Sequence, residues 1–178
     1  MSNHLDSTFL KTRRNKNAHS RNTGRKLYQT ELYQQVIGFC CTHCKNDVQS
    51  DATVCGVQNR NHCPYCLWSK HVDLYTAGDR LCACKAGMRP LGLAFNKSRN
   101  KYGSAQGDLM LIHHCMDCSA FSINRIAADD DSQRLLELYH ACLKLTKPLC
   151  AQLHLAGIQP VGSPDEAVVY ARLFGVQA

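Results

Sequence analysis

Two pairs of cysteines near the start of the chain have the spacing of a metal site. Cys41-Thr42-His43-Cys44 is followed, after 18 intervening residues, by Cys63-Pro64-Tyr65-Cys66. A two-residue gap lets both sulfurs of a pair turn to one side of a tight loop, and two such loops complete a tetrahedron around Zn²⁺. The spacing falls within the range of four-cysteine zinc sites, so we expect Cys41, Cys44, Cys63 and Cys66 to bind zinc. Cys40 should point the other way along its strand.

A third pair, Cys115-Met116-Asp117-Cys118, needs two more ligands to bind a metal ion. The cysteines that could contribute are Cys55, Cys82 and Cys84, and we expect Cys84 or Cys82 to do so. The candidate histidines are His62, His71, His113 and His114. We favour His71, because Asp73 or Asp79 could accept a hydrogen bond from its second ring nitrogen. His113 is the alternative, although its place two residues before Cys115 is sterically tighter.

Other chemistries use the same residue types. Cys63-Pro64-Tyr65-Cys66 is also the spelling of a glutaredoxin redox centre, but its flanks are turn-like and another cysteine pair lies at metal spacing from it. The His-x-Glu of zinc deaminases and the His-Glu-x-x-His of metalloproteases are both absent. No acidic residue is placed by spacing alone as a catalytic base, so we expect no catalytic residues, and an enzyme with zinc or a free thiol at work is the least favoured alternative.

Twelve cysteines in 178 residues need an explanation by disulfides, metal or redox chemistry. The first residues carry no apolar run of a secretory signal, and no segment is apolar enough to span a bilayer. We therefore expect a cytoplasmic protein with reduced cysteines that bind metal and no membrane partner. An organellar presequence in residues 1–27 is the alternative, because this stretch is rich in arginine and poor in acidic residues.

The net charge of +7 is concentrated at the N-terminus. Residues 1–30 hold seven Lys/Arg against one acidic residue, and residues 31–178 hold fourteen against thirteen. Such a segment can follow phosphates by counterion release, which favours RNA as a partner. The residues that we expect to bind nucleic acid are Arg13, Arg14, Lys16, Arg21, Arg25, Lys26, Lys97, Arg99 and Lys101. The rings of Tyr65, Trp68 and Tyr102 are available for stacking.

The elements that must position these residues divide the chain into three parts. Residues 1–26 have the composition of a disordered basic tail. Residues 27–130 should form a zinc-binding domain with one hairpin around Cys41–Cys44 and a second in which 109–112 turns at Cys115–Cys118 and returns through 120–123. Residues 131–178 should be helical, over 132–146, 149–156 and from a capping box at Ser163 to Gly175. The fold class is α+β, a zinc-ribbon or treble-clef-like module with one or two zinc ions, followed by helices.

Several spaced motifs resemble the RNHCP domain family of bacterial zinc-binding proteins. These motifs are "RNHCPYCLWSKHVD" from Arg60, "GDR", Cys84 followed by "GMRP", "HHCMDC" and "NRIAADD". The resemblance covers about residues 39–130 and supports Cys41 over Cys40 and Cys84 over Cys82. It implies the ligands Cys41, Cys44, Cys63, Cys66, His71, Cys84, Cys115 and Cys118, with His113 also at a recurrent position. The sequence departs from the family pattern in two places: Lys85-Ala86-Gly87 follows Cys84 where the family usually has a glycine sooner, and Ser119 stands where a glycine often follows the last cysteine.

Three functions are compatible with these features. The first is an RNA-binding, ribosome-associated zinc protein whose basic tail contacts phosphates. The second is a protein-interaction module with structural zinc, whose protein partner would meet the C-terminal helices. The third is the enzyme considered above. We favour the first, and we expect two zinc ions as cofactors.

Overall fold

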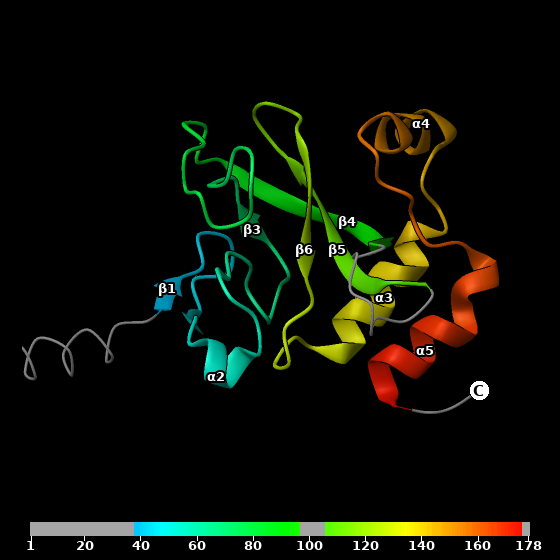
Figure 1. Ribbon diagram of the computed structural model, residues 1–178, viewed down its shortest axis with the longest axis horizontal. Helices are drawn as coiled ribbons and strands as arrows, with labels where there is room; N and C mark the ends of the chain where they lie inside the picture. The colour runs from blue at the N-terminus through cyan, green and yellow to red at the C-terminus, as the bar shows by residue number, and fades with distance from the viewer. Residues whose placement is uncertain (1–37, 97–105, 176–178) are drawn as a thin grey trace, which may run out of the picture. The chain divides into compact units, whose positions relative to one another are not determined.

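The computed structural model describes residues 38–96 and 106–175 (Figure 1). Residues 1–37, 97–105 and 176–178 lie outside these ranges. All nine residues expected to bind nucleic acid therefore fall outside the described part of the chain. The expected boundaries after residues 26 and 130 stay predictions.

Two antiparallel sheets organise the described residues from Gly38 to Arg125. Strands β1 (Gly38–Cys40) and β2 (Asp47–Gln49) form the hairpin expected around the first cysteine pair, with Phe39 opposite Val48. The larger sheet has the order β3-β4-β5-β6, built from β3 (Ser69–Lys70), β4 (Gly87–Asn96), β5 (Asp108–Cys115) and β6 (Phe121–Arg125). The hairpin of β5 and β6 matches the second one expected. A short helix, α2 (Ala52–Cys55), follows β2.

Strand β4 differs from the short strands expected in this region. It runs for ten residues between β3 and β5 although it contains Pro90, which has no N–H to donate to a neighbouring strand. The register of β4 against β5 shifts between Pro90 and Gly92, so the proline lies at a bulge. The irregularity explains why the alternation that marks a strand is weak in this sequence.

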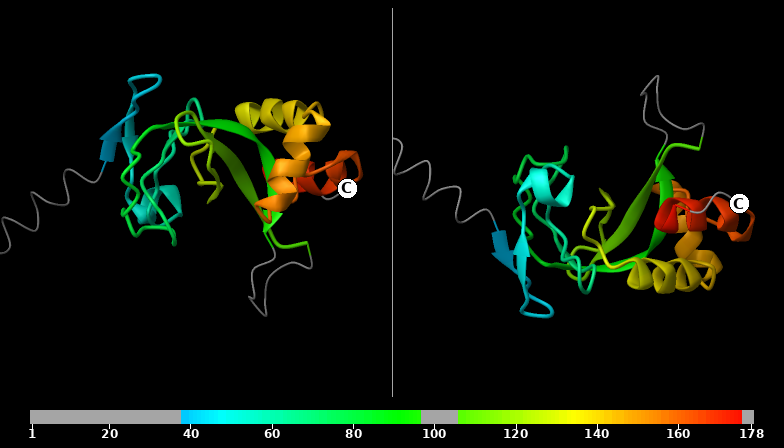
Figure 2. Two further views of the ribbon diagram at one scale, coloured as in Figure 1. Left: turned by 90° about the horizontal axis from the view of Figure 1, so that it is seen from above. Right: turned by 90° about the horizontal axis from the view of Figure 1, so that it is seen from below.

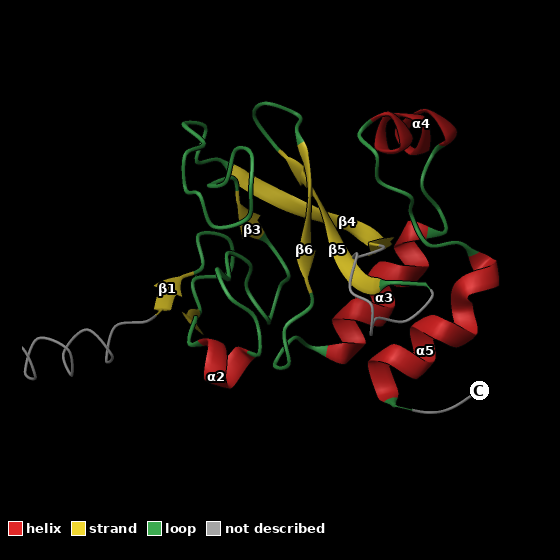
Figure 3. Cartoon of the chain, in the orientation of Figure 1, coloured by secondary structure: helices red, strands yellow, loops and turns green. Residues whose placement is uncertain are grey.

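Helices cover both faces of the larger sheet (Figures 2 and 3). Leu111 of β5 packs in a cluster with Leu135 and Tyr139 of α3 (Ser132–Cys142). The next residue, Ile112, packs with Leu153 of α4 (Lys147–Leu155). Because successive strand residues point to opposite faces, α3 and α4 lie on opposite faces of the sheet. The sheet therefore has an apolar core of its own on each face.

The helices lie where the sequence predicted them, but three of their limits differ: α3 ends at Cys142 and not near residue 146, α4 begins at Lys147 and not at residue 149, and the cap before the last helix is shifted. Asp131 caps α3 by accepting hydrogen bonds from the backbone of Gln133 and Arg134. A 3₁₀ turn, η1 (Ser163–Asp165), leads into α5 (Glu166–Phe174), which ends at Gly175 as expected. The capping bond there is made by the Asp165 side chain, which accepts from the backbone N–H of Gly162 at 2.7 Å. The cap is therefore one residue earlier than the expected Ser163.

Candidate metal centres

The first cysteine cluster brings together all four residues that spacing predicted. Cys41, Cys44, Cys63 and Cys66 present their sulfurs within 4.8 Å of one another. The Sγ atoms of Cys41 and Cys66 lie 3.6 Å apart, and those of Cys44 and Cys63 lie 3.5 Å apart. A tetrahedral zinc ion with Zn–S bonds of 2.3 Å separates its sulfurs by about 3.8 Å. The cluster can therefore hold a metal ion of this size after small adjustments.

Each cysteine pair belongs to a loop with the same backbone bonds. The N–H of the first cysteine donates to the carbonyl two residues after the second cysteine, as in Cys41 to Asn46 and Cys63 to Trp68. The residue after the second cysteine, Lys45 or Leu67, donates back to the carbonyl of the first. It does so with a positive φ, 65° at Lys45 and 60° at Leu67. We call this loop a knuckle.

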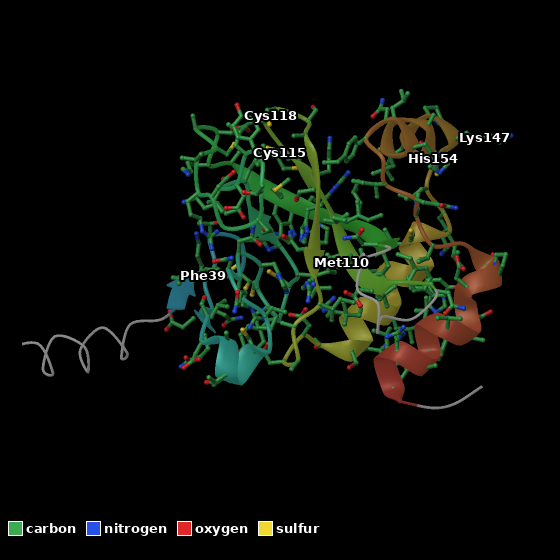
Figure 4. The ribbon with its side chains drawn as sticks, viewed as in Figure 1. Phe39, Met110, Cys115, Cys118, Lys147 and His154 are labelled. Atoms are coloured by element: carbon green, nitrogen blue, oxygen red, sulfur yellow. The ribbon has the colours of Figure 1, made fainter. Side chains whose placement is uncertain are left out.

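The second cluster contains His71, Cys84, Cys115 and Cys118, whose donor atoms again lie within 4.8 Å of one another. The Sγ atoms of Cys84 and Cys115 are 3.6 Å apart, and the Sγ of Cys118 is 3.2 Å from the Nδ1 of His71. Cys115 and Cys118 form a third knuckle at the turn between β5 and β6 (Figure 4). Its first cysteine donates to the carbonyl of Ala120, and Ser119 has a φ of 58°.

His71 and Cys84 form a fourth knuckle that is divided between two segments. The N–H of His71 donates to the carbonyl of Ala86, two residues after Cys84, and Lys85 donates to the carbonyl of His71. Lys85 has a positive φ of 54°, and the residue in this position has a positive φ in the other three loops as well. Residues 72–83 are thus an insertion between the first and second ligands of one knuckle. The sequence did not predict that His71 and Cys84 form one knuckle, because the known zinc-site patterns place the two ligands of a knuckle close together in the chain.

The positive φ values bear on two positions where the sequence departs from the pattern of the RNHCP family that it resembles. Glycine adopts this backbone conformation without a steric penalty, whereas other residues lose about 1–2 kcal/mol. Ser119 and Lys85 occupy such positions. These two departures leave the four donor atoms of the second cluster close together, but they lower the free energy of unfolding through backbone strain.

Other candidates for the second site have different roles. His113 is fully buried, with its Nε2 2.7 Å from the carbonyl oxygen of Leu67 and its Nδ1 2.9 Å from the amide of Asn124. Cys82 is buried outside both clusters, and Cys40 is exposed with its thiol directed at the carbonyl of Lys45.

The expectation that Asp73 or Asp79 would support His71 is wrong for the described residues. Asp79 instead accepts four backbone N–H groups of the 72–83 insertion, which hold the pKa of its carboxyl well below the usual range. Asp73 accepts from the backbone of Arg80 and pairs with its side chain.

Arg60 and His62 form a buried network with Asp129 and Asp130, which follow β6 in the chain. Arg60 donates to both Asp129 and Asp130, and the Nε2 of His62 lies 2.9 Å from a carboxylate oxygen of Asp130. The Nε of Arg60 also donates to the carbonyl of His62, which directly precedes the second knuckle. The network therefore fixes this knuckle to the segment that begins α3, where Asp131 donates to the carbonyl of Pro64.

The thiols of the clusters differ in acidity because their surroundings differ. A hydrogen bond from the backbone of Asn46 lowers the pKa of Cys44 to about 7, and burial raises the pKa of Cys63 to about 11. Burial also acts to raise the pKa of Cys115, but backbone bonds from Cys118 and Asp117 outweigh it and lower the value to about 6. Four thiolates this close repel one another unless a cation lies between them.

Two sites, each assembled from two knuckles, define a small metal-binding domain; the third knuckle joins strands β5 and β6 of the helix-covered sheet. Comparison of the sequence with protein families agrees, because the RNHCP domain matches residues 37–136, more than half of the chain. The chain belongs to the RNHCP domain family. No curated protein and no solved structure matches it. Among the helices of the described ranges, none has the length and apolarity needed to cross a bilayer.

Proposed function

We propose that the protein is a non-catalytic zinc protein with two structural Zn²⁺ ions, which binds RNA through its basic N-terminal segment. The proposal of two structural zinc ions rests on the number of protein ligands in each cluster. Each cluster offers four protein ligands, Cys₄ in one and Cys₃His in the other. Structural zinc sites are closed in this way, whereas catalytic zinc keeps one position for water or substrate. Thiolate-rich tetrahedral donors also favour zinc over the hard cations calcium and magnesium.

The role of the metal follows from how little apolar core surrounds the first cluster. Its buried apolar contacts consist of Val48 and the cysteines themselves, with Phe39 at the margin. The sheet of β4 to β6, in contrast, packs against α3 and α4 on its two faces. Zinc therefore contributes most of the stability around the first cluster, and we expect the helices to keep part of their structure without it.

Elemental analysis of single-cysteine variants tests this arrangement. The wild-type protein should contain two zinc ions per chain, and Cys84→Ser should lower the content to one. Cys82→Ser is the matched control, because this thiol lies two residues away and outside both clusters, and it should retain two. Equal loss from both variants, or a wild type without zinc, would overturn the assignment.

The distribution of charge supports RNA as the partner. The described residues carry eleven Lys/Arg against twelve Asp/Glu, so their formal sum is 11 − 12 = −1. The positive charge is concentrated in residues 1–30 and 97–101, which a polyanion would neutralise with release of counterions. The same proposal places the protein in the cytoplasm, in contact with RNA or the ribosome, where thiolate ligands stay reduced.

Replacing basic tail residues in the full chain tests the RNA proposal. We expect Arg13→Ser with Arg14→Ser and Lys16→Ser to weaken binding to single-stranded RNA and to reduce the dependence of log K on log salt by about 0.7 per residue removed. Lys144→Ser is the control for loss of a charge elsewhere. An unchanged affinity and salt slope in the tail variant would refute the role of the tail.

A protein partner at the C-terminal helices is the second candidate. Leu155 of α4 is 89% exposed, and Phe174 at the end of α5 is 44% exposed. Contiguous exposed apolar patches mark contact surfaces, whereas single exposed apolar side chains are ordinary, so these two residues only define where a partner would be sought. Leu155→Glu should abolish capture of such a partner while zinc content and RNA binding stay unchanged, and retained capture would exclude this surface.

A further inference from the structure

One face of the larger sheet carries aromatic and basic side chains next to the metal centres. Strand register determines its composition. Arg89 of β4 lies opposite His114 of β5, which in turn lies opposite Phe121 of β6. Residues paired across an antiparallel sheet point to the same side. These three side chains therefore form a row across the sheet, on the face that carries Ile112 and is covered by α4 farther along.

Lys70 of the edge strand β3 and Trp68, which directly precedes this strand, extend the same surface beside the row. Lys70 lies opposite Gly87, which is two residues before Arg89 and so belongs to the same face. The ring of Trp68 lies over Gly87, where its Cζ3 would be 3.5 Å from an added Cβ. Glycine at this position leaves the indole room to lie close to the sheet.

Two pairs of stacked rings lie on this surface. His43, from the first knuckle, stacks on Trp68 with ring centroids 4.2 Å apart and planes inclined by 7°. His43 is exposed, so the ring side that faces away from Trp68 is open to solvent. His114 and Phe121 stack at 4.9 Å with an inclination of 28°. The first pair thus presents a flat ring on which a further planar group can continue the stack.

Lys70 and Arg89 are both exposed, and neither has an acidic partner among residues 38–96 and 106–175. Within the described ranges, neither Lys70 nor Arg89 takes part in an ion pair, whereas Arg60, Arg80, Arg125 and Arg134 all do. An anion that approaches the face therefore displaces no carboxylate. Stacking rings beside unpaired cations are the features with which proteins bind single-stranded nucleic acid.

We propose that the face formed by His43, Trp68, Lys70, Arg89, His114 and Phe121 binds two or three nucleotides of single-stranded RNA, with a base stacked on His43 and phosphates contacting Lys70 and Arg89. The row from β3 to β6 spans three strand spacings, about 14 Å. Four-stranded sheets of this width stack two or three bases in other RNA-binding domains. This inference rests on the proposed RNA-binding function and assigns a site to it, distinct from the tail.

Trp68 provides a direct measurement, because it is the only tryptophan in the chain. The zinc-loaded full chain is titrated with a short single-stranded oligouridine while tryptophan fluorescence is recorded. We expect saturable quenching, since a base that extends the stack of His43 on Trp68 alters the surroundings of the indole. Binding without any change in Trp68 emission would overturn the face proposal.

Variants then separate the face from the tail. His43→Ala should lower the affinity for oligouridine by about 5- to 150-fold, the range for loss of one stacked base. Lys70→Glu and Arg89→Glu should each lower the affinity and reduce the salt slope by about 1. Lys144→Glu, an equally exposed charge reversal in the linker after α3, is the matched control. Zinc content and circular dichroism confirm that each variant is folded.

The outcomes distinguish the two proposals. If the face variants behave as the wild type while the tail variant loses affinity, the face is not a site and the tail proposal stands. If the tail variant binds normally while the face variants lose affinity and quenching, the face is a site and the tail proposal fails. If polyglutamate quenches Trp68 as strongly as oligouridine at equal charge, the face binds acidic chains in general and the assignment to RNA is wrong.

Discussion

Replacement of Asp130 by asparagine is the sharpest test of the buried network. The carboxylate of Asp130 accepts hydrogen bonds from the Nη2 of Arg60 at 3.0 Å and from the backbone N–H of Ala127 at 2.8 Å, and it pairs with the Nε2 of His62. The side chains of Arg60 and Asp130 are both fully buried. In Asp130→Asn an amide N–H₂ replaces one acceptor oxygen and leaves buried donors unsatisfied. Breaking a buried pair in this way costs about 3–5 kcal/mol in the free energy of unfolding.

Urea unfolding of the zinc-loaded protein measures this loss. Asp129→Asn is the matched control, because Asp129 also accepts from Arg60 but its side chain is 35% exposed. Water can replace the bonds lost there, so we expect a decrease of about 1 kcal/mol. If the two variants lost equal stability, or if Asp130→Asn cost less than the control, the network would not have the structural role assigned to it.

Three further changes test other parts of the fold. Ser119→Gly should raise the free energy of unfolding by about 0.5–1 kcal/mol, because glycine adopts the positive φ of this position without steric strain. Ser119→Val should lower the free energy of unfolding, and the opposite order of the two variants would contradict the knuckle geometry. Burial lowers the pKa of His113 to about 3, so the folded state binds no proton there while the unfolded state does below pH 6.5. The contribution of His113 to the free energy of unfolding should therefore be fully present above pH 6.5 and fall by up to about 1.4 kcal/mol per pH unit toward pH 3. In urea unfolding, the free energy of unfolding of His113→Gln should depend less on pH over pH 5–7. An unchanged pH dependence would refute this role of His113. Leu153→Ala should lower the free energy of unfolding by about 2–5 kcal/mol, because Leu153 is fully buried. Leu155→Ala, two residues away and 89% exposed, should change it by less than about 0.5 kcal/mol. Similar losses for the two variants in urea unfolding would contradict the packing of α4 described above.

The sequence was most informative where ligands are close in the chain. Cys41–Cys44, Cys63–Cys66 and Cys115–Cys118 could be recognised because a two-residue gap has one simple geometric meaning. Helices α3 and α5 could be recognised because their apolar spacing and end residues agree. In these cases the structure and the pattern depend on the same few neighbouring residues.

Features that depend on distant residues could not be read in the same way. The carboxylates that pair with Arg60 lie 69 and 70 residues further along the chain, and no local pattern connects them. His71 and Cys84 belong to one knuckle although residues 72–83 separate them. The preference for His71 over His113 rested partly on Asp73 and Asp79, which bind the backbone of the insertion instead. The resemblance to the family contained both Cys84 and the Asp129-Asp130 pair without indicating what they contact.

Because the knuckle of His71 and Cys84 is divided, residues 72–83 form a loop into which a foreign peptide could be inserted. Both ends of this segment are fastened by the bonds between His71 and Ala86 and between Lys85 and His71, close to the metal ligands. Between these ends, Leu74, Tyr75 and Leu81 are exposed, so the tip of the segment contributes little to either core. Because closing a longer loop between fixed ends adds only about 0.6 kcal/mol per doubling of its length, a peptide epitope or a fluorescent label could be inserted there. The metal ion bound by His71 and Cys84 would then hold both ends of the inserted peptide on the domain.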